Sequence, residues 1–314
     1  MVHTFKGLRD QVLRLIGEDG DTVPETVVKD LMNQAHMNRV TQHEWPFMKW
    51  FRHETLSVSS GTSRYVLHQE YGKGINFINT STGEQLIEVP SRETLDRASQ
   101  YGDSAGTGAP REFFLADTQQ VKAQPATPAT VNIVSSSASD TTAAKAIIIK
   151  GETSTGDVTT ESITPNGVTP VVSSTTWKTI LQVTKSATWT GTLTLKDAAS
   201  VTLLTLYPTE MGRTYRVLEF LRPPDAGATI AYTFFRKPLE LVNDYDIPQL
   251  PDQHAQILVW DTLLLMAGYV NIQGDLSGWV QMQERLERNL YREYGFDQST
   301  RNAGPTFIKY TGDY

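Results

Sequence analysis

The chain has 314 residues, no cysteine and a formal net charge of −7 at pH 7. The absence of cysteine excludes disulfides, thiolate metal sites and cysteine nucleophiles, and the acidic balance argues against nucleic-acid phosphates as the main binding partner. Hydrophobic residues at 39% and charged residues at 20% are typical of a soluble globular protein with one large or two modest domains. The longest apolar run, 257–270, is interrupted by Asp261, so no membrane span is predicted. The first residues lack the pattern of a secretion signal.

Two amphipathic helices are predicted near the N-terminus. Apolar residues recur at helical spacing over 4–17 and over 23–40, and Pro24 stands at a first-turn position of the second helix. Two β-hairpins are predicted to follow, because apolar and polar residues alternate around a turn in both 54–67 and 74–89.

An aromatic knot separates these helices from the first hairpin. It consists of Trp45, Phe47, Trp50 and Phe51. Pro46 disfavours helical geometry at the residue before it, so the knot is predicted to stop the second helix. We expect the four rings to be buried where the helices pack against the first hairpin. Trp45 and Phe47 are also candidate contacts to a neighbouring subunit.

The composition changes in the middle of the chain. Residues 124–212 are rich in Ser, Thr, Val and Ile and poor in aromatics, and short apolar or alternating runs are separated there by Gly, Asn, Asp and Ser. This pattern predicts a small β-sandwich inserted into a host domain. Trp177 and Trp189 lie within it, and two tryptophans in such a sandwich fit its core better than a sugar-stacking surface.

After the insert, strands are predicted in 214–221 and 228–237, followed by long helices over 250–270 and 275–295. On the last helix Arg285, Arg288 and Arg292 alternate with glutamates. Mixed signs of this kind predict a salt-bridged surface that faces solvent or another subunit.

These elements together predict an α+β fold, namely a helical bundle with a β-hairpin/β-sheet region plus an inserted small all-β sandwich domain. Residues 1–123 and 213–314 would form a discontinuous core, 124–212 the insert, and 296–314 a C-terminal tail.

The motifs that suggest chemistry lack the context that chemistry needs. The Gly-x-Ser-x-Gly pattern at 102–106, around Ser104, has neither an apolar strand before it nor a helix after it. His36 and His43 are seven residues apart, which is not a metal-ligand spacing. Asp244 and Asp246 precede a helix, where turn chemistry explains them. We therefore predict no catalytic residue, no metal, no cofactor and no enzymatic activity.

The order of the elements is more informative than any single motif. The helix "VVKDLMNQAHMNRVTQHEWPF" ends in the aromatic knot, the segment "TLSVSSGTSRYVL" follows, and "LRPPDAGATIAYTFFRKPLELVNDYDIPQLPDQHAQILVW" leads into the final helices. This order resembles the head-to-tail adaptor (connector) proteins of tailed bacteriophages, over roughly 1–122 and 214–295. The insert is similar to the immunoglobulin-like modules of phage structural proteins.

The resemblance implies a virion protein of the capsid vertex, made in the host cytoplasm. It implies a homo-oligomeric ring of twelve copies below the portal protein, which extends the DNA channel and offers a platform to a tail or nozzle protein. Genomic DNA would pass through without specific binding, and no membrane is involved. The tail residues Phe307, Ile308 and Tyr310 would dock on the portal.

Two alternatives stay open. The chain could be a tail or baseplate component whose insert binds host-surface glycans through Trp177 and Trp189. It could also be an unrelated enzyme whose site the sequence does not reveal.

Overall fold

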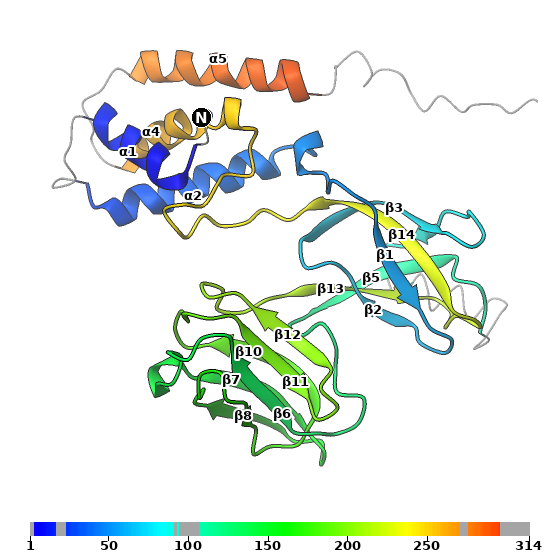
Figure 1. The fold of residues 1–314 in the computed structure, drawn as a ribbon. Helices are drawn as coiled ribbons and strands as arrows, with labels where there is room; N and C mark the ends of the chain where they lie inside the picture. The colour runs from blue at the N-terminus through cyan, green and yellow to red at the C-terminus, as the bar shows by residue number, and fades with distance from the viewer. Residues whose placement is uncertain (1–2, 17–22, 91–92, 94–106, 270–275, 296–314) are drawn as a thin grey trace, which may run out of the picture. The chain divides into compact units, whose positions relative to one another are not determined.

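The computed structural model describes residues 3–16, 23–90, 93, 107–269 and 276–295 (Figure 1). The chain divides into two compact units. One comprises Met1–Trp50 and Arg236–Tyr314, and is called here the helical unit; the other comprises Phe51–Phe235 and is called the β unit. The helices found in the described residues are not long and apolar enough to cross a membrane.

The helical unit is built around one apolar helix. Its four described α-helices are α1 (Phe5–Leu15), α2 (Glu25–Thr41), α4 (Ile257–Tyr269) and α5 (Leu276–Tyr294), with short 3-10 turns η1 (Pro46–Met48) and η3 (Asp252–His254). Helix α4 contacts each of the other three. A helix that is apolar on almost every side is stable in water only when its neighbours cover it. The fully buried side chains of this core include Leu8, Met32, Leu258 and Leu263.

Two small sheets of the β unit are formed by strands that precede and follow the insert in the chain. The first has the order β1-β14-β3, and the second has the order β2-β13-β5-β4. The strands of the first sheet are β1 (Glu54–Val58), β3 (Tyr71–Asn79) and β14 (Ala228–Arg236), and those of the second are β2 (Arg64–Val66), β4 (Ile87–Glu88), β5 (Glu112–Gln119) and β13 (Tyr215–Phe220).

The predicted hairpin over 54–67 is wrong in its pairing. Strand β1 pairs antiparallel with β14 and β2 pairs antiparallel with β13, so the two predicted arms belong to different sheets. The alternation indicates strands correctly, but it carries no information about their partners. Strand β14 is the better partner because Ile230, Tyr232 and Phe234 are buried, which gives the sheet an apolar face that a two-stranded hairpin lacks.

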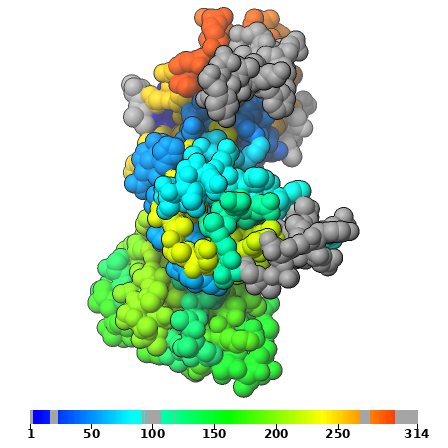
Figure 2. Space-filling view, turned by 90° about the vertical axis from the view of Figure 1, so that its right-hand side faces the viewer, coloured from blue at the N-terminus to red at the C-terminus, as the bar shows by residue number. Residues whose placement is uncertain are grey.

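The inserted region forms two further sheets, with the orders β10-β7-β8 and β12-β11-β6-β9. Their buried side chains belong to one hydrophobic core, which includes Ile133, Ile149, Trp177, Val183, Leu195 and Leu204. In Figure 2 the green residues of this region pack together as one body. Its strands are β6 (Val131–Ser135), β7 (Ile147–Thr153), β8 (Val158–Ile163), β9 (Val171–Val172), β10 (Trp177–Lys185), β11 (Leu193–Asp197) and β12 (Thr202–Leu206).

The predicted fold class is therefore wrong. Strands account for 33% and helices for 26% of the described residues, so the described structure is not a helical bundle that carries a small β region. The reason is the pairing described above: the segments on either side of the insert join each other in two sheets, and these sheets lie with the insert in one unit. The boundary between the units falls at Phe51 and Phe235, whereas the expected host core ran over 1–123 and 213–314.

Candidate protein-binding surface on the helical unit

Residues 237–251, called here the crossing segment, connect β14 to η3 and lie against α1 and α2. The side chain of Asn33 on α2 holds Leu241 at both backbone atoms, with the amide nitrogen donating to the carbonyl and the amide oxygen accepting from the N–H, each at 2.8 Å. The backbone N–H groups of Phe5 and Lys6 donate to the carbonyls of Asp246 and Asp244, at 2.8 and 3.0 Å. The backbone of the segment is thus hydrogen-bonded to both helices, through the backbone of α1 and through the Asn33 side chain of α2.

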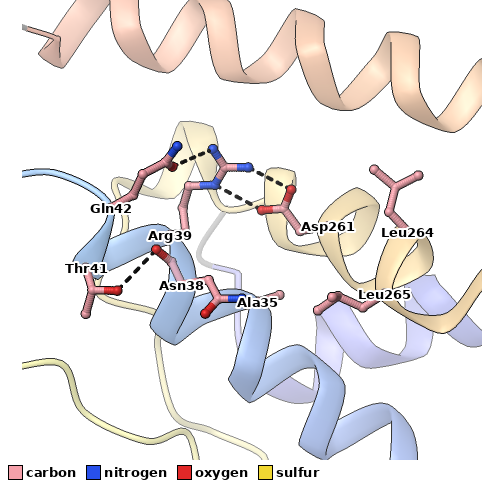
Figure 3. A pocket seen from close by; sticks show the side chains of 8 residues that line it. All are labelled: Ala35, Asn38, Arg39, Thr41, Gln42, Asp261, Leu264 and Leu265. Carbon is pink, nitrogen blue, oxygen red and sulfur yellow. Dashed lines mark hydrogen bonds and ion pairs between the residues drawn. The ribbon is translucent and has the colours of Figure 1, made fainter. Parts of the chain in front are cut away.

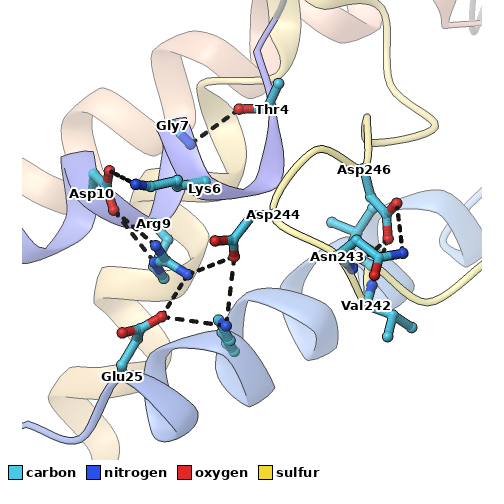
Figure 4. A network of polar contacts seen from close by, with 12 residues as sticks. Thr4, Lys6, Gly7, Arg9, Asp10, Glu25, Val242, Asn243, Asp244 and Asp246 are labelled. Atoms are coloured by element: carbon cyan, nitrogen blue, oxygen red, sulfur yellow. Dashed lines mark hydrogen bonds and ion pairs between the residues drawn. The ribbon is translucent and has the colours of Figure 1, made fainter. Parts of the chain in front are cut away.

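Two aspartates stabilise this geometry further. The Asp246 carboxylate accepts from the N–H groups of Val242 and Asn243, both at 2.7 Å, which closes a tight turn. Asp244 pairs with Arg9, whose Nη1 lies 2.9 Å from its Oδ1 (Figure 4). The prediction of turn chemistry is confirmed for Asp246. For Asp244 it is wrong, because that carboxylate is held by ion pairs with Arg9 and Lys29.

Arg9 joins the crossing segment to both N-terminal helices. Its side chain is only 6% exposed, and it contacts Asp10 on α1 and Glu25 on α2, with nitrogen–oxygen distances of 3.2 and 2.6 Å. Lys29 closes the network by pairing with Glu25 and Asp244. The positive charges are therefore used to position the crossing segment.

Although its backbone is fixed, the crossing segment presents large apolar side chains to solvent. They are Leu239, Val242, Tyr245 and Ile247, which are 39%, 56%, 84% and 59% exposed. Single exposed apolar side chains are common, but a cluster on one rigid segment indicates a site for another protein. The sequence does not identify these residues as a site. Their signal is a group of apolar residues without strand or helix period, bounded by prolines 238 and 248, which also includes the buried Leu241.

A pocket adjoins the crossing segment. It has a volume of about 490 Å³ and is lined by Phe47, Arg236, Ile247, Pro248, Gln249, Leu250, Pro251 and Tyr294. Phe47 stacks on Trp45 with ring centroids 5.4 Å apart, and Tyr294 meets it edge-on, also at 5.4 Å. One wall of this pocket is therefore a rigid aromatic stack.

The aromatic knot has a different role from the one predicted. Trp45 has extended backbone geometry, as Pro46 requires, although α2 itself ends earlier, at Thr41. Trp45 is 1% exposed and packs against Tyr291 of α5. Phe51 is 80% exposed, so the prediction that all four rings form a buried plug is wrong. Of the two candidate subunit contacts, Trp45 is buried within the chain and Phe47 lines the pocket.

Charges of both signs are exposed on α5. Arg285, Arg288 and Arg292 are exposed, and so are Glu284 and Glu293. Glu287 is less exposed and pairs with Arg39 at 3.0 Å, while Glu293 pairs with His254 at 2.8 Å. Arg288 Nε donates to the backbone carbonyl of Glu284. The exposed face of the helix therefore carries mixed charges, as the alternating signs in the sequence predict.

A second cavity, of about 480 Å³, lies between α2 and α4 (Figure 3). Arg39 reaches across it to Asp261, with 2.7 Å between Nη2 and Oδ1, and donates to Gln42. Burial raises the pKa of Asp261 even though Arg39 opposes this shift. Because each group is bonded to another, the cluster is a buried ion network that joins helices, and we assign it no chemistry.

His36 makes the crossing segment sensitive to acid. This side chain is fully buried, its Nε2 accepts from the N–H of Gln249 at 3.1 Å, and burial lowers its pKa from 6.5 to about 4. As the pH falls, His36 is therefore protonated in the unfolded chain at a higher pH than in the folded chain. The contribution of neutral His36 to stability is complete above pH 6.5 and declines as the pH falls toward 4. We expect a loss of about 3 kcal/mol in the unfolding free energy of the helical unit.

Urea unfolding at several pH values between 7 and 4 measures this effect. The control is His36→Gln, whose side-chain oxygen can accept the same hydrogen bond without titrating. A variant that loses as much stability as the wild type over this range would contradict the assignment.

The other predicted site residues do not form a site in the described structure. Trp177 and Trp189 are 0% and 4% exposed, so they belong to the core of the insert and offer no face to a sugar. Ser104 and the tail residues Phe307, Ile308 and Tyr310 lie outside the described residues. Within the described part of the chain, histidine, aspartate and glutamate side chains form no group that could hold a metal ion.

Comparison with protein-family models gives no match, and comparison with curated proteins gives none either.

Proposed function

We propose that this chain is a structural subunit of a tailed-phage virion, a head-to-tail adaptor that assembles as a ring below the portal. The observation that carries the proposal is the crossing segment, whose backbone is fixed while Val242, Tyr245 and Ile247 face solvent. An interface that is already ordered loses little entropy on association. A head-to-tail contact that repeats from copy to copy forms a ring when its rotation closes.

The order of the elements and the charge agree with this proposal. The helix, the aromatic knot and the final helix pair stand in the order found in the adaptor family. A net charge of −7 suits a ring through which DNA passes without being retained. The tail or nozzle protein and the portal are its proposed partners, with 296–314 as the segment that docks on the portal.

The alternative of a glycan-binding tail component is less well supported. Its two stacking residues, Trp177 and Trp189, are buried, whereas aromatic side chains that bind sugars need an accessible face. A glycan array probed with the purified protein separates the two functions, since the adaptor is expected to bind no glycan on it.

Electron cryomicroscopy of the chain mixed with its portal protein tests the proposal. We expect a ring of this chain on one end of the portal, and loss of that complex when 301–314 are deleted. A chain that remains monomeric and separate from the portal would show that the proposed function is wrong.

A further inference from the structure

The pocket beside the crossing segment holds a positive charge that the described chain does not neutralise. Among its lining residues Arg236 carries a charge and there is no carboxylate. Arg236 Nη2 donates to the carbonyl oxygen of Phe47 at 3.1 Å, which is a neutral acceptor. Its Nε is buried and has no acceptor among the described residues. The guanidinium therefore has charge and donor capacity that the described chain leaves unused, which is unfavourable for a buried donor.

The rest of the pocket is apolar and stiff. Phe47 is held between Trp45 and Tyr294, and Pro248 and Pro251 restrict the backbone on the other side. A wall that does not rearrange favours a rigid, apolar group over a flexible polar one. The chemistry of the pocket thus combines an apolar socket with a cation on its lining.

The occupant is large enough to extend beyond the pocket. Ile247 lines the pocket and is 59% exposed, and it continues along the crossing segment to Tyr245, which is 84% exposed. A ligand the size of one amino acid would fill the socket and leave this apolar surface uncovered. A segment of another protein covers both.

We propose that the pocket binds a segment of another protein chain that places an aromatic or large aliphatic side chain next to an Asp or Glu. The apolar side chain fills the socket beside Phe47, and the carboxylate pairs with Arg236. A guanidinium–carboxylate hydrogen bond is stronger than one between neutral groups, so Arg236 makes the acidic residue part of the specificity. This inference rests on the proposed function only in taking the crossing segment as a protein interface.

Two capped peptides that differ in one group test the proposal. They are acetyl-Gly-Phe-Asp-Gly-amide and acetyl-Gly-Phe-Asn-Gly-amide, titrated into labelled full-length protein and followed by NMR at the Ile247 methyl groups and the Arg236 Nε–H. The Asp peptide is expected to shift both signals and to bind at least about five-fold more tightly than the Asn peptide.

The variants locate this preference. Arg236→Gln should reduce the ratio of the affinities for the Asp and Asn peptides to about one, whereas Arg236→Lys should retain a preference for the Asp peptide. Arg292→Gln, on the exposed face of α5, should leave this affinity ratio unchanged. Equal binding of the two peptides to the wild type, or no shift at Ile247 and Arg236 with either one, would overturn the proposal. Because these titrations do not require a ring, they can fail while ring assembly succeeds, and the reverse also holds.

Discussion

Replacing Arg39 by methionine is expected to lower the unfolding free energy of the helical unit by about 3–5 kcal/mol. Arg39 is 7% exposed at its side chain and pairs with two carboxylates, those of Asp261 and Glu287, at 2.7 and 3.0 Å. Without the guanidinium, the two acids share one half-buried space with no cation between them. An intact buried ion network contributes little more to stability than an apolar core of the same size would. Removing one partner is nevertheless strongly destabilising, because it leaves buried charges uncompensated.

Urea unfolding followed by tryptophan fluorescence measures the loss. Arg288→Met, on the exposed face of α5, is the matched control and should change stability by no more than about 0.5 kcal/mol. If Arg39→Met and the control behave alike, the ion network is not what joins α2, α4 and α5. A triple variant that also neutralises both acids should recover part of the loss, because it removes the unpaired charges.

The second large effect is expected in the insert, where Asp140→Ala should destabilise the sandwich by about 3–5 kcal/mol. Asp140 is fully buried. Its carboxylate accepts from Ser135 Oγ and Lys145 Nζ, both at 2.6 Å, and from the N–H groups of Thr190 and Gly191, both at 2.9 Å. The substitution removes the carboxylate partner of a partly buried ammonium and leaves two backbone donors without their acceptor.

The same contacts determine the response of the sandwich to acid. Burial alone would raise the pKa of Asp140, but the bonds from Lys145, Ser135 and the two backbone N–H groups outweigh it and hold the pKa well below its usual range. This contribution to stability is present above the unfolded pKa, near 3.8, and is lost only as the pH falls below it.

Thermal unfolding of the Asp140→Ala variant and of the exposed control Asp157→Ala tests the role of Asp140. Equal melting temperatures would contradict the assigned role.

The sequence predicts well the features that depend on neighbours along the chain. Helices α1 and α2 follow from the spacing of residues such as Leu8 and Val28, and the extended geometry at Trp45 follows from Pro46. The strands of the insert follow from short Val- and Ile-rich runs between turn residues. In each case the cause lies within a few residues of its effect.

What the sequence does not predict depends on contacts between distant segments. Nothing in 54–67 indicates that β1 will pair with β14 rather than β2, because alternation defines a strand and not its partner. The ion pairs of α5 depend likewise on Arg39 and His254, which lie far from Glu287 and Glu293 in sequence. The sequence does not indicate the crossing segment as a site because its apolar residues have no period, and their exposure is seen only in the structure.

The central claim is that the crossing segment is an assembly surface, and the mass of the particle in solution tests it most directly. Val242 and Val168 are 56% and 57% exposed, one on the crossing segment and the other in the insert. Native mass spectrometry of Val242→Asp and Val168→Asp therefore compares the same chemical change at two surfaces. We expect the wild type and Val168→Asp to form rings and Val242→Asp to remain monomeric. Rings in both variants, or in neither, would contradict the claim.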